Sequence, residues 1–525
     1  MSSPEVMSKY VRASDWKPWA AKLHVANVER LVTNLGGENL YGQHSDYLEI
    51  ALRELIQNGR DAIVARRSLD PGFEGKLIIR FKEDADSCCF LSVEDDGTGM
   101  SERVLTGPLL DFGTSFWATS LVQEEFPGLR SSKFKPVGKF GIGFYSIFMI
   151  ANEVRVASRR WDRGLDTICQ LHFPHGLSLR PIVSFGDRQG FGGYTSTLVS
   201  CRLNSGIMNR DRVVEVNSGM FGVADFKVKI ADYLAALTAG LDIGVELECD
   251  GEKVIVHESI STVVRDRKYN DWLSRISFFA YQPGVVGPIN AYASRLRPLL
   301  SGERIVGLAT LRTDSGGHFM NVRTVGGLAA SVHARHSSNF IGYMDHEPGS
   351  AKREGTRIAA STDDLKVWSD EQIRILEMAD LPPLAWCIIT CDLAGLEIDP
   401  SPVLKAAFRR QDQFNILGLE EIFKELDRDA IAILKMRHLD HVEVNSAAGP
   451  LENYLTFQPV VNSGFLSLKL DGDIPVDKLS FIGCLYRYAA SKGRRLLWQT
   501  RPGVGISFFG PIDALLISLS PEVSC

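Results

Sequence analysis

The sequence predicts a mixed α/β protein of several domains, in which helices and strands alternate along the chain. The chain has 525 residues, which at roughly 150 residues per domain corresponds to about three domains. Hydrophobic residues make up 45% of the chain and charged residues 23%, as is typical of globular proteins. Helical periodicity in residues 47–67 is followed by strand-like runs at 76–81 and 89–93, the alternation expected of an α/β fold.

The rest of the first region continues this alternation. Residues 144–151 have a second helical pattern, and residues 154–158 and 197–203 are strand-like. Residues 204–218 are polar and contain glycine, which predicts a loop at a domain boundary.

A second boundary is expected where Asp-Pro-Ser-Pro interrupts the chain at residues 399–402. A helical pattern follows over residues 402–436. We therefore expect three domains, at residues 1–215, 216–400 and 401–525.

The composition argues against several classes of protein. The 58 basic and 64 acidic residues give a net charge of −6, which offers no overall attraction for nucleic acid or anionic lipid. The nine cysteines contain no C-x-x-C pair, so free thiols are expected. The N-terminus lacks the basic and apolar segments of a signal peptide, and the longest apolar stretches fall short of the ~20 residues of a membrane span. We expect a cytoplasmic protein that does not associate with membranes.

Three polar residues share one stripe of the first predicted helix. Glu54, Asn58 and Asp61 stand at positions i, i+4 and i+7, which places them on one helix face. Apolar residues occupy a neighbouring arc, so the helix can bury one side while the polar stripe faces a cleft. Taken alone, such a stripe is more often a solvated surface.

A second motif follows the strand-like run at 89–93. Asp95 precedes glycines at 97 and 99, in a turn that glycine forms with little strain. An isolated D-x-G-x-G is more often a plain strand-terminating turn. The functional alternative is a buried carboxylate that accepts a hydrogen bond from the amino group of adenine.

The third motif is a glycine-rich loop at residues 138–144 that leads into the predicted helix at 144–151. Glycines before a helix N-terminus leave N–H groups free to bind phosphate. The spacing is G-x-x-G-x-G, which fits neither the Rossmann fingerprint nor the P-loop. A flexible hinge is the alternative interpretation.

Together, in this order, the three motifs resemble the GHKL superfamily of ATPases, which comprises Hsp90, type II topoisomerases, histidine kinases and MutL-type proteins. The stretches LRELIQNGRDAI, EDDGTGM and GKFGIGFYSIFMIANEV are most similar to Hsp90. The resemblance implies a Bergerat-type GHKL α/β sandwich, followed by an Hsp90-like α/β middle domain. We expect the region after residue 400 to form a smaller mixed C-terminal domain.

The resemblance also implies a role for each motif residue, with ATP and Mg²⁺ as cofactors. Glu54 matches the general base that activates the attacking water, and Asn58 matches the ligand of the phosphate-bound magnesium ion. Asp95 matches the carboxylate that binds the adenine amino group. Thr197 resembles a threonine of the family's last nucleotide-site strand, with Thr195 as an alternative. The other implied nucleotide-binding residues are Asp61, Gly99, Met100, Gly138, Phe140, Gly141, Ile142, Gly143 and Phe144.

The segment between the second and third motifs, residues 101–137, corresponds to the family's mobile lid. Within it, residues 111–114 resemble a lid Ser-Gly-Thr element in which a lysine and a serine have been replaced. Ser196 also stands where the family usually has glycine.

A weaker resemblance extends into the second region. Residues 318–325 and 340–345 are similar to a strand and a core segment of the Hsp90 middle domain. Arg353 falls near the family's Ser-Arg-Glu loop and is the predicted arginine that stabilises the γ-phosphate. Lys352 and Arg357 are alternatives, and all three residues are equally explained as solvated loop charges.

The resemblance implies an ATP-dependent chaperone, in which ATP binding and slow hydrolysis drive lid closure and remodel client proteins. A homodimer formed through the C-terminal region is expected by analogy. The alternative is a GHKL switch that acts on nucleic acid or in a signalling or defence complex, as MORC-like or MutL-like proteins do. The net charge of −6 argues against nucleic acid as the partner.

Two further interpretations have less support. A histidine kinase needs a phosphoacceptor helix before the ATPase region, where His24 and His44 are the sole histidines. A metal site at His333, His336 and His346 lacks clear ligand spacing.

Overall fold

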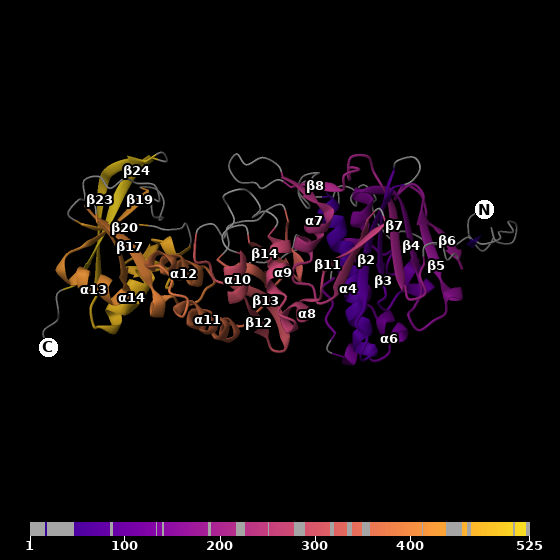
Figure 1. Ribbon diagram of the computed structural model, residues 1–525, viewed down its shortest axis with the longest axis horizontal. Helices are drawn as coiled ribbons and strands as arrows, with labels where there is room; N and C mark the ends of the chain where they lie inside the picture. The colour runs from indigo at the N-terminus through magenta and orange to yellow at the C-terminus, as the bar shows by residue number, and fades with distance from the viewer. Residues whose placement is uncertain are drawn as a thin grey trace. The chain divides into compact units, whose positions relative to one another are not determined.

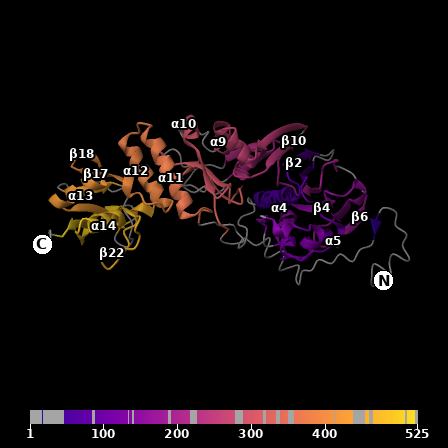
Figure 2. The ribbon, with the colours of Figure 1, turned by 90° about the horizontal axis from the view of Figure 1, so that it is seen from below.

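The structure is a computed structural model whose elements carry the labels of Figures 1 and 2. It describes residues 16–17, 47–83, 88–132, 134–138, 141–186, 191–216, 226–249, 251–277, 289–314, 320–332, 339–348, 357–411, 413–436, 454–458, 464–507 and 510–520. Helices and strands alternate through these residues, so the predicted mixed α/β class is confirmed.

The chain divides into two compact units. The first comprises Met1–Phe278, Val322–Arg335 and Met344–Ala359, and the second comprises Phe279–Asn321, His336–Tyr343 and Ala360–Cys525. The predicted boundaries near residues 215 and 400 stay predictions. No helix in the described part of the chain is long and apolar enough to cross a membrane.

A nine-stranded sheet forms the centre of the first unit, in the order β1-β6-β5-β4-β7-β3-β2-β10-β11. Its neighbouring strands are antiparallel, except that β2 and β10 run parallel. The strands are β1 (Trp16–Lys17), β2 (Lys76–Glu83), β3 (Cys89–Asp95), β4 (Ala151–Ser158), β5 (Cys169–Phe173), β6 (Ile182–Phe185), β7 (Thr197–Leu203), β10 (Gly244–Cys249) and β11 (Glu252–His257). The four strand-like runs predicted in the first region all lie within these strands.

Helix α4 (Tyr47–Leu69) covers one face of this sheet and contacts β2 and β3. Its apolar arc is buried, with Leu48, Leu52, Leu55 and Ile63 at most 5% exposed, so hydrophobic burial fixes which side faces the sheet. The predicted helix at 47–67 is therefore confirmed. The remaining helices of the unit are α5 (Glu102–Thr106), η2 (Phe116–Ala118), α6 (Leu121–Glu125), η3 (Leu129–Ser131), η4 (Gly143–Met149), η5 (Leu165–Thr167), α7 (Ile230–Leu237), α8 (Ile260–Arg265) and α9 (Tyr269–Ile276).

The predicted α-helix at residues 144–151 is wrong. The segment forms the 3-10 helix η4, and Ala151 begins strand β4. Phe144 and Phe148 both pack against Phe173, with ring centroids 6.1 Å and 5.2 Å apart. Because the apolar run is short and includes the start of a strand, its periodicity could not distinguish the two.

Residues 322–335 and 344–359 belong to the first unit, and Ala330 and Val332 contact α4. Residues 321–345 hold β14 (Asn321–Val325), β15 (Leu328–Ala329) and β16 (Ile341–Asp345), and the small sheet β8 (Val213–Val216) and β9 (Phe226–Lys229) completes the unit. The backbone N–H of Val332 donates to Glu49 at 2.9 Å, and Arg53 donates to the carbonyl oxygen of Ala330 at 2.7 Å. Glu49, Arg53 and Val332 are buried, so these bonds fix the segment beside the start of α4.

The second unit contains a six-stranded sheet in the order β18-β17-β20-β19-β24-β23. Its helices α13 and α14 lie side by side, and Phe457 stacks on Phe481 with centroids 4.5 Å apart in the core. The unit's elements are α10 (Ile289–Arg295), β12 (Arg297–Ser301), β13 (Arg304–Thr310), α11 (Thr362–Glu377), α12 (Pro383–Gly395), η8 (Ser401–Val403), β17 (Lys405–Arg410), β18 (Gln413–Gly418), α13 (Leu419–Arg428), β19 (Ile431–Met436), β20 (Leu455–Gln458), η9 (Gly464–Leu466), β21 (Leu470–Asp471), β22 (Ile474–Pro475), α14 (Phe481–Ser491), β23 (Leu496–Ser507) and β24 (Gly510–Leu519).

The prediction of a helix over residues 402–436 is also wrong. The segment is a β-hairpin, the ten-residue helix α13 and strand β19. The hairpin turns at Gln411, whose φ of 53° is left-handed, and Phe408 pairs with Asn415 across it. Only residues 419–428 form a helix as predicted, because pairing within the sheet determines the conformation of the other residues of this segment.

Candidate functional site

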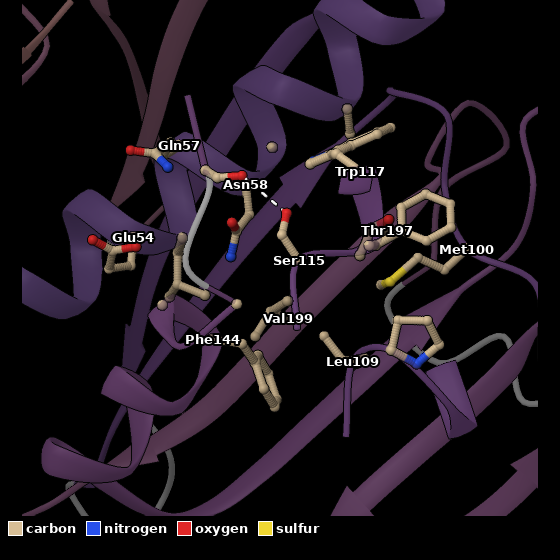
Figure 3. A pocket seen from close by; sticks show the side chains of 18 of the residues that line it. Glu54, Gln57, Asn58, Met100, Leu109, Ser115, Trp117, Phe144, Thr197 and Val199 are labelled. Atoms are coloured by element: carbon tan, nitrogen blue, oxygen red, sulfur yellow. Dashed lines mark hydrogen bonds between the residues drawn. The ribbon is translucent and has the colours of Figure 1, made fainter. Parts of the chain in front are cut away.

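A cavity of about 390 Å³ lies in the first unit between α4 and the strands β3, β4 and β7. Figure 3 shows side chains from three sources converging there: Asn58 from α4, Ser115 from the predicted lid and Val199 from β7. The sequence-predicted residues that line the cavity are Glu54, Asn58, Asp95, Gly99, Met100, Gly138, Gly141, Ile142, Gly143, Phe144 and Thr197.

Helix α4 presents Glu54 and Asn58 to the cavity from successive turns. Glu54 is half-buried and Asn58 is exposed. Their spacing of four residues keeps both side chains on one side of the helix, while the apolar arc is buried beneath. Two residues of the polar stripe predicted from the sequence, Glu54 and Asn58, therefore face the cavity.

Asp61, the third residue of the stripe, does not line the cavity. It is fully buried, and its carboxylate accepts hydrogen bonds from the backbone N–H groups of Val137 and Gly138, at 3.0 Å and 2.8 Å. Arg60 donates to it at 2.9 Å. Burial raises the pKa of Asp61 above its ordinary value, and the Arg60 charge and the two N–H groups act in the opposite direction. Asp61 thus holds the start of the glycine-rich loop from behind.

Asp95 is the last residue of β3, and its side chain lies on the buried face of that strand. Oδ1 accepts a hydrogen bond of 2.9 Å from the N–H of Gly97, the first glycine of the D-x-G-x-G motif. The pKa of Asp95 is raised to about 8, chiefly by burial and in smaller part by the nearby carboxylates of Asp96 and Glu94, while the hydrogen bond from Gly97 acts in the opposite direction. A carboxylate with so little solvation is a strong acceptor for a donor brought by a ligand.

Gly99 provides the close approach that the second motif requires. Its φ is +62°, and a Cβ atom there would lie 1.8 Å from the carbonyl oxygen of Arg159. Only glycine fits such a position, so the backbone after Asp95 can pass close to the neighbouring strand end and leave the cavity open.

Thr197, rather than Thr195, faces the cavity. Thr197 pairs with Asp95 across β3 and β7, and its Oγ1 lies 3.0 Å from Oγ of Ser158. Thr195 instead donates a short hydrogen bond to Glu94. Ser196 is buried, and its backbone carbonyl oxygen accepts a hydrogen bond from the hydroxyl group of Ser158.

The glycine-rich loop lies against α4. A Cβ atom on Gly143 would lie 2.1 Å from Oε2 of Glu54, and one on Gly138 would lie 3.0 Å from Nε2 of Gln57. Glycine at both positions therefore lets the loop approach the polar side of the helix. Phe140, a predicted nucleotide-binding residue, lies outside the described residues.

The predicted lid also contributes to the cavity and contacts the glycine-rich loop. Ser115 donates to the carbonyl oxygen of Gly138 at 3.0 Å, and the N–H of Gly113 donates to the carbonyl oxygen of Gly141 at 3.2 Å. Trp117 lines the cavity and packs against Phe134, with centroids 5.0 Å apart. The lid residues on the cavity wall are Val104, Pro108, Leu109, Thr114, Ser115, Phe116, Trp117 and Val137.

Sequence reasoning missed three kinds of lining residue. Gln57 lies between Glu54 and Asn58 in the first motif but outside the stripe, so helical spacing gave no reason to choose it. Val325 and Pro348 come from the segment at 322–348, which only tertiary packing brings here. The lid aromatics stand in a stretch with no recognisable motif.

The structure does not test the prediction that Arg353 stabilises the γ-phosphate. Arg353 and its alternative Lys352 lie outside the described residues, as do His333 and His336. Arg357 is exposed and does not line the cavity. His346 is buried, and among the described residues no group of three or more His, Cys, Asp or Glu side chains could hold a metal ion.

A magnesium ion brought with nucleotide phosphates does not need such a group. Mg²⁺ at nucleotide sites takes one or two protein oxygens together with phosphates and waters. The exposed amide of Asn58 lies in the cavity one turn from Glu54, and its oxygen is a suitable hard ligand. The residues present therefore fit a phosphate-bound Mg²⁺.

Comparison with known proteins defines the class first. Residues 45–174 match the family described as "Histidine kinase-, DNA gyrase B-, and HSP90-like ATPase". These residues contain α4, the Asp95 turn, the lid and the glycine-rich loop. The fold, the cavity and this match place the region in the GHKL class of ATPase domains.

Within that class, the region is of the Hsp90 type. It is 38% identical over 133 residues to chaperone protein HtpG of Chlorobaculum tepidum, which covers 23% of this chain and 21% of that protein. HtpG of Anaplasma marginale is 37% identical over 125 residues (22% of this chain and 19% of that protein), and HtpG of Wolbachia sp. subsp. Brugia malayi is 39% identical over 132 residues (22% and 20%). The resemblance to Hsp90 is thereby confirmed, over about a fifth of each chaperone's length.

Proposed function

We propose that this chain is an ATP-dependent chaperone of the Hsp90 type, which binds ATP with Mg²⁺ in the cavity beside α4 and hydrolyses it slowly to remodel client proteins. One observation carries the proposal: Glu54, Asn58 and Asp95 line a single cavity. The match to the HSP90-like ATPases and to HtpG chaperones supports it.

The Asp95 end of the cavity suits an adenine base. The single hydroxyl proton of Ser158 is donated to the carbonyl oxygen of Ser196 at 2.9 Å, so the hydroxyl of Thr197 is the donor in its 3.0 Å bond to Ser158. Thr197 Oγ1 can then act only as an acceptor toward the cavity, as can the ionised carboxylate of Asp95. Two acceptors side by side favour an exocyclic amino group.

The glycine-rich end suits the phosphates. Gly138, Gly141 and Gly143 bring backbone close to the cavity, and no lysine or arginine occurs among the described lining residues. Mg²⁺, held by the amide oxygen of Asn58, would neutralise phosphate charge there. We therefore expect the affinity for ATP to depend strongly on magnesium.

Glu54 is the proposed general base. Its carboxylate accepts a proton from a water whose oxygen forms a bond to the γ-phosphorus. The bond from the γ-phosphorus to the β–γ bridging oxygen breaks, its electron pair leaves with ADP, and inorganic phosphate is released. Arg353 is the proposed arginine that stabilises the charge on the transferred phosphoryl group.

The lid couples nucleotide state to conformation in this proposal. Ser115 and Gly113 contact the glycine-rich loop, so a γ-phosphate bound by that loop changes the contacts available to the lid. ATP then stabilises a closed state that ADP does not hold. Turnover is slow because lid closure precedes chemistry.

Turnover and affinity of three variants test the proposal. Glu54→Ala should abolish ATP hydrolysis while it keeps ATP affinity, and Asp95→Asn should weaken ATP binding. Glu246→Ala, which removes a half-exposed partner of Lys76, is the matched control and should hydrolyse ATP as the wild type does. Hydrolysis by Glu54→Ala at the wild-type rate would overturn the role of Glu54.

A second measurement distinguishes a client protein from nucleic acid as the partner of this chain. We expect an unfolded protein to stimulate ATP turnover of the full chain, and double-stranded DNA to have no effect. Stimulation by DNA alone, lost as salt is raised, would instead favour a switch that acts on nucleic acid.

A further inference from the structure

Gln57 has a buried hydrogen-bond acceptor without a partner in the wall of the cavity. The side chain is 2% exposed, and its Oε1 atom has no hydrogen-bond partner in the described part of the chain. Among the described residues that line the cavity, Gln57 alone has such an atom. An unpaired buried carbonyl oxygen is unfavourable, so a ligand that brings a donor to it would be bound more tightly or in a more defined position.

The position of Gln57 limits what that donor can be. Its amide lies against Gly138, since a Cβ atom there would be 3.0 Å from Nε2, and in Figure 3 Gln57 and Glu54 stand on the same side of Asn58. This is the proposed phosphate end of the cavity. Phosphate oxygens of ATP are acceptors only, the amino group of the base is assigned to Asp95, and the ribose hydroxyls lie between the base and the phosphates. A water molecule is therefore the donor that remains.

Glu54 and Gln57 are three residues apart on α4, so their Cβ atoms are neighbours about 5–6 Å apart on the helix surface. A water between the two side chains has two O–H groups to donate. One can be donated to the Glu54 carboxylate and the other to Oε1 of Gln57. Its lone pair is then left to face the γ-phosphorus.

We propose that Gln57 orients the water that attacks the γ-phosphate. The inference rests on the proposed ATPase function and adds a residue to it. Glu54 takes one proton of the water as the new oxygen–phosphorus bond forms and the bond to the β–γ bridging oxygen breaks. Gln57 holds the second O–H throughout and transfers no proton, so ADP and phosphate leave as before.

Gln57→Leu tests the proposal, because leucine keeps most of the volume and lacks the acceptor. We expect kcat for ATP to fall about 10- to 100-fold, since a misplaced nucleophile has an effect of this size. The affinity for ATP should change by less than about twofold, the pattern of an interaction made only during the reaction. Gln372→Leu is the matched control: Gln372 is equally buried on α11, also has an unpartnered Oε1, and should leave kcat unchanged.

Gln57→Glu provides a second, independent measurement. It keeps an acceptor at Oε1, so kcat should exceed that of Gln57→Leu. It also places a second carboxylate beside Glu54, which makes the pair harder to ionise. The acidic limb of the plot of kcat against pH should therefore move to higher pH.

The outcomes separate this proposal from the ATPase function. If the wild type hydrolyses ATP and Gln57→Leu does so equally fast, or loses affinity as much as kcat, the role of Gln57 is overturned and the ATPase stands. If the wild type binds ATP without turnover, both fail. If Gln57→Leu does not fold, an unshifted pH profile in Gln57→Glu overturns the role of Gln57.

Discussion

Gly143 and Glu54 approach so closely that a Cβ atom on the glycine would lie 2.1 Å from Oε2 of the carboxylate. The distance is far below van der Waals contact, so any side chain at residue 143 must displace either the loop or Glu54. The last glycine of the G-x-x-G-x-G motif thus does more than free backbone N–H groups. It leaves the space that the proposed general base occupies.

Gly143→Ala should therefore act on chemistry through Glu54. We expect kcat for ATP to fall about 10- to 100-fold because the base is misplaced, as measured by steady-state phosphate release. Gly193→Ala is the control, since a Cβ atom there would meet nothing within 4 Å. Equal turnover of the two variants would show that the close approach has no functional role.

Asp61 is expected to support the site through stability. Asp61→Ala leaves two backbone N–H groups without their acceptor, while Arg60 keeps its pair with Asp242. Because unsatisfied buried donors are unfavourable, the free energy of unfolding should fall by about 1–3 kcal/mol. Urea denaturation measures the loss. Asp70→Ala, which removes a half-exposed partner of Arg66, should lower it by less than about 1 kcal/mol. Similar effects of the two would mean that Asp61 does not brace the loop.

Helix α4 and strands of the first unit could be predicted from the sequence, because the spacing of their buried apolar residues follows the periodicity of a helix or a strand. Asp61 differs from Glu54 in depth: seven residues along a helix is about 10 Å, which carries Asp61 beneath residues 137–138 while Glu54 stays at the cavity. No spacing rule contains that information. Val325 and Pro348 line the same cavity although they are distant from it in the sequence. The hairpin at 405–418 forms through pairing of its strands within a sheet. Local sequence patterns could predict neither the two lining residues nor the hairpin.

Asp95 should make nucleotide affinity depend on pH. Its pKa in the empty cavity is raised to about 8 by burial, and a donor from adenine is best accepted by the ionised form. Binding then lowers this pKa, so the affinity for ADP should rise about tenfold from pH 7 to pH 9, as the ionised fraction does. Calorimetry in buffers of different ionisation heat should detect a proton released on binding. A flat affinity over this range would contradict the assignment.

The same carboxyl should weaken the empty protein at high pH. Folding raises the pKa of Asp95 from 3.8 to about 8, so its contribution to stability is complete below the lower value and is lost as the pH rises through the higher one. Asn cannot ionise. The melting temperature of Asp95→Asn relative to the wild type should therefore increase between about pH 4 and pH 8, and a constant difference would argue against the raised pKa.

Base selectivity gives the sharpest test of the Asp95 end. Oδ1 of Asp95 accepts from the N–H of Gly97 at 2.9 Å, so an asparagine at this position would keep its oxygen there and turn its NH₂ group toward the base. The wild type should prefer ATP to ITP by about 10- to 100-fold, because inosine presents a 6-oxo acceptor where adenine has an amino donor. Asp95→Asn should weaken ATP binding and reverse the preference, since its NH₂ group repels an amino donor and complements the 6-oxo group. Displacement of a fluorescent ATP analogue by each nucleotide measures both affinities. If Asp95→Asn retains the wild-type preference for ATP, the base does not lie against Asp95, and the orientation of nucleotide proposed for this cavity is wrong.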